Sequence, residues 1–444
     1  MKRKSFYLTV LLMLLLLGLG GAIAQPAQTT AAETAEFVTA ENLSGVIAYA
    51  GLDNSGRAVS IKRIDANGAN PQTLYTLPDA GEISDVAWAP NGREVGFISS
   101  EEAAYSPFNQ DIFAVHANGQ TIRRISNPPR WRNLPNGAQT GVVQGTLRNN
   151  SGRNNVSIIS LYIQGATTGA QIPMFNHLDT VNFSLNVADL GNGQMHYMVI
   201  SWADGLGGPY KEIVPAIVDV LPGQTVNIGT FDFVGQTNQP NISDLSWNQN
   251  SSLVGVILEN GSASPWQIDA AGEVVGNLMT DASLVSALAI SPTDNRIAYY
   301  RNNGGEGVIA LNQIGGTAAT EQVILNDTIA SLNYDRHIAW LPDGSGLVIT
   351  VNGNIYDYII ATQDVRPLTS LSAGAKIDRV AVSPDGQFIA FSYSETAGVS
   401  DIYIMNRITS DITQLTTDGR SAFPSWSRTT PPTNWYIYIP MLNR

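Results

Sequence analysis

Four residues with polar, ionisable side chains, one in each of four similar stretches of the sequence, are the main candidates for chemistry. Asp85, Asp244, His337 and Arg379 each stand three residues before a large apolar residue. Two carboxylates, an imidazole and a guanidinium that converge can bind a polar ligand, and the carboxylates could also hold a divalent cation. Whether they converge depends on the fold that positions them.

The four stretches belong to a repeat. Each copy has an apolar anchor residue, a turn rich in Pro, Asp, Asn and Gly, and then further short runs that alternate between apolar and polar residues, which is typical of antiparallel strands. The anchors are Trp88, Trp247, Ile290, Trp340, Val382 and Trp426. All intervals between successive anchors except the first are close to the ~40–50 residues of one four-stranded propeller blade.

The anchor strands also predict a central channel. The residue before each anchor is small: Ala87, Ser246, Ala289, Ala339, Ala381 and Ser425. Side chains alternate between the two faces of a strand, so this position and the one two residues earlier share a face. We expect this face to line the channel. The earlier positions then form a ring near one mouth: Asp85, Asp244, Ala287, His337, Arg379 and Phe423. In the alternative interpretation, the polar ring residues pair with one another or cap loop amides.

The two ends of the repeat region complement each other. Residues 46–77 contain three strands without an anchor strand, and residues 422–428 contain an anchor strand without the other three. Joining them gives one composite blade and hides two sheet edges that would otherwise be exposed. The predicted fold is therefore all-β, a six-bladed β-propeller closed by its N- and C-terminal strands.

The first interval between anchors is about 110 residues longer than one blade. The excess lies between Pro128-Pro129 and Pro240, and it contains about six short strand-like segments, among them 156–163, 213–220 and 225–233. Such a segment predicts a small β-sandwich inserted after the first complete blade. The expected organisation is a signal peptide (1–24), a flexible linker (25–43), a propeller in two parts (44–127 and 241–428), the inserted sandwich (128–240) and a C-terminal tail (429–444).

The best copy of the repeat is Val382-Ser383-Pro384-Asp385-Gly386-Gln387-Phe388-Ile389-Ala390-Phe391. It resembles the WD40-like (PD40) repeats of the TolB-like family of six-bladed propellers. That resemblance implies a propeller that contacts other proteins at the cell envelope. Within the insert, residues 145–152 and 221–227 resemble the carboxypeptidase-regulatory, transthyretin-like sandwich family. An immunoglobulin-like sandwich remains the alternative for the insert.

The N-terminus has the features of a secretory signal. Lys2, Arg3 and Lys4 precede an apolar run, and Ala22-Ile23-Ala24 supplies the small residues of a cleavage site. Cleavage after Ala24 would remove three positive charges and lower the formal net charge from −13 to −16. Such a charge disfavours nucleic acid as a partner. We expect an extracytoplasmic protein, in the periplasm, secreted or at the cell surface, whose mature chain does not span a membrane.

The sequence lacks the usual catalytic motifs. It has no Gly-x-Ser-x-Gly elbow, no His-Glu-x-x-His pair and no cysteine. The leading interpretation is a non-catalytic binding or scaffold protein without a cofactor, which contacts a protein or another ligand through the propeller face and the sandwich. One alternative is a metal-dependent hydrolase of the lactonase type at the channel mouth. The other is a carbohydrate or cell-wall binding protein that uses exposed aromatic residues such as Trp131, Tyr210 and Trp266.

Overall fold

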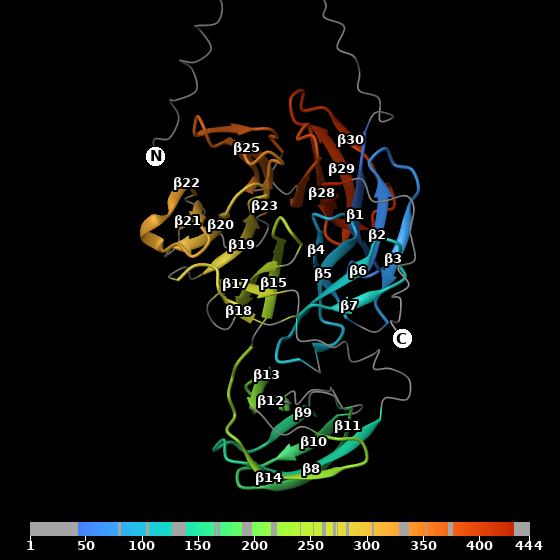
Figure 1. Cartoon of the computed structure of the whole chain (residues 1–444), viewed down its shortest axis with the longest axis vertical. Coiled ribbons are helices and arrows are strands. Elements are labelled where there is room, and N and C mark those ends of the chain that lie inside the picture. Colours follow the sequence, from blue (N-terminus) through green and yellow to red (C-terminus); the bar gives the residue numbers. More distant parts are fainter. Residues whose placement is uncertain are drawn as a thin grey trace, which may run out of the picture. The chain divides into compact units, whose positions relative to one another are not determined.

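The computed structural model of the chain describes residues 43–429, apart from 79–80, 104–105, 127–138, 164–165, 167–168, 189–197, 215–219, 240, 252, 260–262, 270–271, 273, 281–283, 304–305, 328–336, 352 and 372–375. The predicted signal peptide lies outside the described residues, as do nearly all of the predicted linker and tail. Figure 1 labels strands where there is room.

Within the described residues, six four-stranded sheets come from the repeat region. Five of them consist of consecutive strands. These are β4 to β7 (Ile83–Trp88, Glu94–Ser99, Asp111–His116, Ile122–Arg124), β15 to β18 (Asn241–Trp247, Leu253–Glu259, Ala263–Asp269, Val274–Asn277), β19 to β22 (Val285–Ile290, Arg296–Asn303, Glu306–Gln313, Gln322–Asp327), β23 to β26 (Ile338–Trp340, Gly346–Val351, Asn354–Ile359, Asp364–Pro367) and β27 to β30 (Lys376–Val382, Phe388–Thr396, Val399–Asn406, Ile412–Gln414). The first strand of each sheet carries the anchor.

The sixth sheet joins the two ends of the repeat region. Its strands are β1 (Val46–Leu52), β2 (Ala58–Asp65), β3 (Gln72–Thr76) and β31 (Ser421–Trp426), and β31 pairs antiparallel with β1. In this pairing Ile47 lies opposite Trp426, and Gly51 lies opposite Ser421. The innermost strands contact each other in the circular order β31, β4, β15, β19, β23, β27 and back to β31. The predicted six-bladed propeller, closed by its N- and C-terminal strands, is confirmed.

The anchor tryptophans pack between adjacent blades. The indole of Trp247 contacts the preceding blade and donates from Nε1 to the carbonyl oxygen of Ala87 at 3.0 Å. Trp340 makes the equivalent bond to the carbonyl of Ala289 at 2.9 Å. The close approach requires a residue without a side chain at Gly96, where a Cβ atom would lie 2.8 Å from the Trp247 ring. Trp247 and Trp340 therefore each add both apolar contact and a hydrogen bond to a blade junction.

The recurring Pro-Asp-Gly turn forms as its residue types predict. Asp385 accepts hydrogen bonds from the Ser383 hydroxyl at 2.5 Å and from the amide of Gln387 at 3.0 Å. Gly386 has φ of 74°, a conformation that glycine adopts without a steric penalty. This turn connects the anchor strand to the next strand.

A second recurring contact ties the outer strands together. An amide of the third strand donates to a Ser or Thr hydroxyl that follows the fourth strand: Ile112 to Ser126 (2.9 Å), Ile355 to Thr369 (2.8 Å) and Ile402 to Thr416 (2.9 Å). A backbone group is thus satisfied where the outer ladder ends. This explains why hydroxyl residues recur after the fourth strand of the repeat.

The insert between β7 and β15 forms two sheets (Figure 1). One has the order β11-β8-β14 and the other β10-β9-β12-β13, with strands β8 (Thr140–Asn149), β9 (Val156–Ile163), β10 (Ala170–Phe175), β11 (Thr180–Ala188), β12 (Met198–Asp204), β13 (Gly207–Val214) and β14 (Thr225–Phe233). Both sheets bury side chains in one core that includes Phe175, Trp202 and Phe233. The predicted strand at 213–220 overlaps β13 at Ile213 and Val214, and its residues 215–219 lie outside the described residues. Strand β10 was not predicted.

A buried lysine links the insert to the first complete blade. Lys211 on β13 is only 2% exposed and donates to the carbonyl oxygen of Ser106 at 3.1 Å and to that of Ala103. Both carbonyls belong to the connection between β5 and β6. Burial lowers the pKa of Lys211 to about 8, because a charged ammonium is less stable away from water.

Candidate functional site in the axial channel

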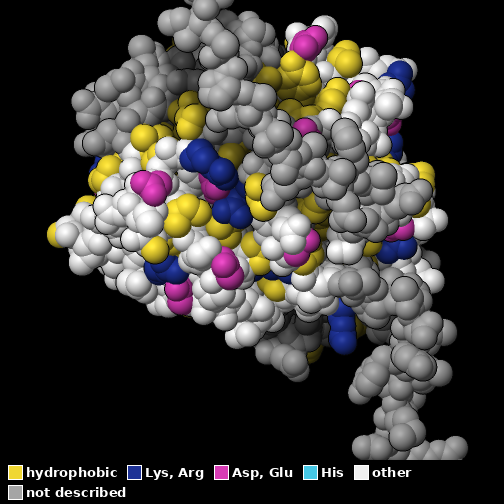
Figure 2. All heavy atoms as spheres, turned by 90° about the horizontal axis from the view of Figure 1, so that it is seen from above, with side chains coloured by type: hydrophobic (Ala, Val, Ile, Leu, Met, Phe, Trp, Pro, Cys, Tyr) yellow, Lys and Arg dark blue, Asp and Glu magenta, His cyan; other side chains and the backbone are white. Residues whose placement is uncertain are grey.

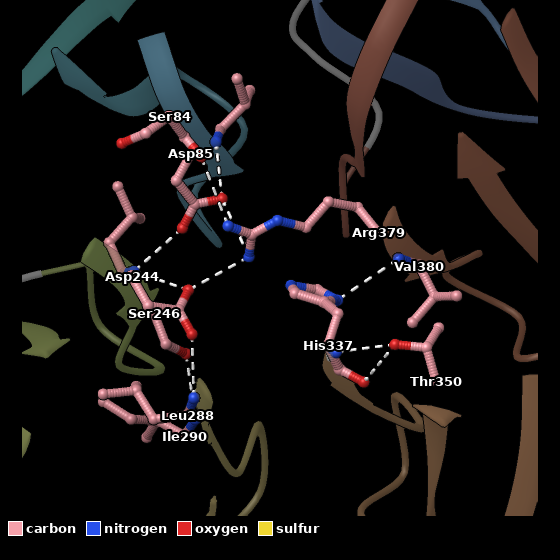
Figure 3. A network of polar contacts seen from close by, with 12 residues as sticks. Ser84, Asp85, Asp244, Ser246, Leu288, Ile290, His337, Thr350, Arg379 and Val380 are labelled. Carbon is pink, nitrogen blue, oxygen red and sulfur yellow. Dashed lines mark hydrogen bonds and ion pairs between the residues drawn. The ribbon is translucent and has the colours of Figure 1, made fainter. Parts of the chain in front are cut away.

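The fold brings the four polar residues of the predicted ring together (Figure 3). Arg379 on β27 places Nη1 3.3 Å from Oδ1 of Asp85 and 3.2 Å from Oδ1 of Asp244. Its Nη2 donates to the carbonyl oxygen of Ser84 at 3.4 Å. The other two ring positions are apolar: Ala287 is buried, and the ring of Phe423 lies 5.8 Å from the Arg379 guanidinium carbon.

Arg379 reaches across the channel. In the circular order of the inner strands, β27 and β15 are three steps apart in either direction, so they stand on opposite sides of the axis. The ion pair between Arg379 and Asp244 therefore spans the channel. The same guanidinium also pairs with Asp85 on β4, at the same position along the channel axis. We call Asp85, Asp244 and Arg379 the plug. The plug combines two carboxyl groups with one guanidinium, and its two aspartates are 2% and 1% exposed.

The ring residues also connect each blade to the next. The amide of Leu245 donates to Oδ2 of Asp85 at 3.0 Å, and the amide of Leu288 donates to Oδ2 of Asp244 at 2.9 Å. In the same way, the amide of Val380 donates to Nδ1 of His337 at 3.3 Å. At three blade junctions, a ring side chain thus accepts a hydrogen bond from the inner strand of the following blade.

Burial dominates the electrostatics of this region. Desolvation raises the pKa of Asp85 well above its ordinary value, and the neighbouring Asp244 adds to this, although Arg379 opposes it. Burial would lower the pKa of Arg379, but the two carboxylates outweigh it and raise that pKa. Burial and the charge of Arg379 lower the pKa of His337 to about 3. His337 is therefore neutral near pH 7, and because Nδ1 accepts a hydrogen bond, its proton is assigned to Nε2.

Below the plug, the inner strands enclose an axial cavity of about 110 Å³. All six small residues that precede the anchors line it: Ala87, Ser246, Ala289, Ala339, Ala381 and Ser425. The prediction that this face of the anchor strands lines the channel is therefore correct. Asp85 and His337 contribute to the wall near the plug. Arg428, which follows β31, contributes at the other end.

The geometry favours a structural role for the polar ring. Both carboxylates of the plug are used by Arg379 and by backbone amides, which is the arrangement that the alternative interpretation of the sequence described. Among the described residues, no group of three or more His, Asp or Glu side chains is arranged to hold a metal ion. Ligand binding by Asp85, Asp244, His337 and Arg379 stays a prediction.

The remaining candidates from the sequence do not converge on the channel. Tyr210 and Trp266, predicted to be exposed, are partly buried: Tyr210 packs 4.9 Å from Trp202 within the insert, and Trp266 packs against a propeller core. Trp131 lies outside the described residues.

Sequence reasoning missed Arg428. In four of the six copies, the second residue after the anchor is the turn proline, namely Pro90, Pro292, Pro342 and Pro384. In the last copy this position is Arg428. A charged residue at a position that is otherwise mostly proline was the available signal.

No protein-family model matches this sequence, and a search of curated proteins gives no match. Among solved structures, a putative TolB from Agrobacterium tumefaciens is 20% identical over 39% of this chain and 61% of that chain, with a TM-score of 0.32. TolB from Acinetobacter baumannii is 14% identical over 87% of this chain and 67% of its own, with a TM-score of 0.33. A nidogen/laminin complex is 10% identical over 86% of this chain and 98% of that chain, with a TM-score of 0.47.

The resemblance of the insert to the transthyretin-like family stays a prediction. The assignment of a six-bladed propeller rests on the six sheets and on the β1–β31 pairing that closes them.

Proposed function

We propose that this chain is an exported, non-catalytic binding or scaffold protein. It would contact a protein or carbohydrate ligand at the cell surface or in the periplasm, through the faces of the propeller and the insert. One observation carries the proposal: the polar residues best placed for chemistry are bound to one another, with Arg379 paired to both Asp85 and Asp244 across the channel.

The same observation weighs against the hydrolase alternative. A lactonase-type site needs carboxylates that are free to hold a cation or to accept a proton from water. Here each carboxylate already binds a guanidinium and a backbone amide of the following blade. Freeing one would break an ion pair and a blade junction together.

The sequence of the N-terminus supports the export part of the proposal, since residues 2–24 combine a basic start, an apolar run and a cleavage-site pattern of small residues. In the part of the chain that the structure covers, no helix is long and apolar enough to cross a bilayer. On the face drawn in Figure 2, Lys and Arg side chains of the described residues are interspersed with Asp and Glu, so its described surface shows no broad basic patch of the kind that binds nucleic acid.

Two measurements on the secreted chain test the proposal. Cross-linking in intact producing cells, followed by mass spectrometry, should recover a defined partner whose cross-links map to the propeller or the insert. A panel of lactones and esters, assayed with added Ca²⁺, should show no turnover. Turnover that falls in Asp85→Asn, with the melting temperature unchanged by that substitution, would refute the proposal and favour the enzyme. Retention on cell-wall polysaccharide without protein cross-links would identify the ligand as carbohydrate.

A further inference from the structure

The end of the axial cavity opposite the plug holds a positive charge that no described residue neutralises. Arg428 lies five residues after the ring position Phe423, which corresponds to about 16 Å along an extended strand, and it lines the cavity. Within the described part of the chain, its guanidinium has no hydrogen bond or ion pair. Burial lowers the pKa of Arg428, with no carboxylate to oppose the effect.

Three other buried or partly buried arginines among the described residues are paired. Arg124 contacts Asp111 at 2.5 Å and Glu102 at 3.2 Å. Arg407 contacts Asp357 at 3.2 Å and also donates to a main-chain carbonyl at 3.0 Å. Arg379 contacts both carboxylates of the plug. Partly buried guanidinium groups are normally matched by an anion, so Arg428 stands apart.

The cavity wall offers further hydrogen-bond donors. The hydroxyl oxygens of Ser246 and Ser425 accept the amides of Ile290 and Trp88, each at 2.9 Å. In the described structure neither hydroxyl donates to another group, so each retains a proton to donate into the cavity. Neutral His337 adds an Nε2–H donor near the plug. The one carboxylate in the wall is that of Asp85, which is paired with Arg379.

Most of the remaining wall is apolar. Ala87, Ala289, Ala339 and Ala381 stand between the serines, and the anchor tryptophans stand behind them. The cavity, at about 110 Å³, is somewhat smaller than a ~150 Å³ cavity that binds benzene. A ligand of this shape has a few carbon atoms and one group that accepts hydrogen bonds.

We propose that the axial cavity binds a small carboxylate, whose oxygens are held by the guanidinium of Arg428 at the mouth and whose alkyl part lies between the alanines. A single guanidinium matches one negative charge, and its planar pair of N–H groups fits the two oxygens of a carboxylate. The carboxylate belongs either to a free short-chain acid or to an acidic side chain of a partner polypeptide. The site lies at the opposite end of the channel from the plug and does not depend on the function proposed above.

Saturation-transfer NMR with butyrate tests the proposal, with butyramide as its uncharged counterpart. We expect butyrate to bind the wild-type chain, and both butyramide binding to the wild type and butyrate binding to Arg428→Gln to be weaker by about tenfold or more. Arg420→Gln is the matched control. It removes the same charge from an exposed arginine before the other end of β31 and should leave butyrate binding unchanged.

The outcomes separate clearly. Equal binding of butyrate and butyramide, equal binding to wild type and Arg428→Gln, or no butyrate signal would overturn the proposal. Circular dichroism and the melting temperature show whether Arg428→Gln is folded, and Arg428→Lys, which keeps the charge but loses the planar fork, should bind with intermediate strength. N-acetylglutamate α-amide, compared with butyrate, distinguishes the two sources: tighter binding of the amide indicates a polypeptide side chain.

Discussion

Replacing Arg379 with methionine tests the plug directly. The substitution keeps an unbranched apolar stem but removes the charge shared by Asp85 and Asp244, which are 2% and 1% exposed. Removing one partner of a buried ion pair typically costs about 3–5 kcal/mol, because the remaining charge is buried and unpaired. We expect the free energy of unfolding to fall by about this amount near pH 7. Urea unfolding followed by tryptophan fluorescence measures it from the midpoint and slope.

The stability of Arg379→Met should depend on pH in a definite direction. In the wild type the pKa of Asp85 is already raised, chiefly by burial, and Arg379 opposes the rise. Without Arg379 the folded-state pKa rises further, so the folded state binds more protons than the unfolded state between the two pKa values. The stability of Arg379→Met therefore increases as the pH falls toward the unfolded-state pKa. The difference from wild type should be largest above both folded-state pKa values of Asp85 and should narrow as the pH falls toward the unfolded-state pKa.

Two controls complete the design. Arg420→Met removes an exposed arginine and should change stability by less than about 0.5 kcal/mol. Changing both plug carboxylates to amides in the Arg379→Met background should recover much of the loss, because the buried charges are then gone. A loss below about 0.5 kcal/mol for Arg379→Met, or a gap from wild type that does not change with pH, would show that the guanidinium does not neutralise the carboxylates as described.

Three further predictions follow from other parts of the fold. Gly96→Ala places a Cβ atom 2.8 Å from the Trp247 ring, and it should lower the free energy of unfolding by about 1–3 kcal/mol through overpacking. Gly276→Ala, where nothing lies within 4 Å of the added Cβ atom, is the control. Equal losses of stability for the two variants in thermal melts would contradict the packing argument. Burial lowers the pKa of Lys211 to about 8, so above that pH the folded state binds fewer protons than the unfolded state. The wild type should therefore gain stability relative to Lys211→Met between pH 8 and about pH 10. A stability difference that stays constant across this range would mean that burial does not lower the pKa of this lysine. Intact-mass analysis of the secreted chain should show the loss of residues 1–24, and retention of Lys2 on the secreted protein would contradict the export signal.

The propeller could be predicted because its signals are local. The Ser383-Pro384-Asp385-Gly386 turn closes through contacts two to five residues apart, so the residue types alone indicate it. Two-residue alternation then places the anchor on one face and the small residue before it on the other. The insert was harder to predict. Strand β10 contains a proline and was missed, and β13 begins at Gly207 after a tight turn that the apolar pattern at 213–220 did not reveal.

The sequence by itself determined the six-fold repeat and the composite closing blade. It also determined that Asp85, Asp244, His337 and Arg379 lie at one level along the channel axis, because each stands three residues before the anchor of its strand. Only the tertiary structure decided what these groups do there. Six blades give a channel narrow enough for one arginine to cross it and reach the carboxylates on the far side. That width depends on how all the blades pack together, and no segment of the sequence encodes it alone. The same packing leaves Arg428 at the other end without a partner among the described residues.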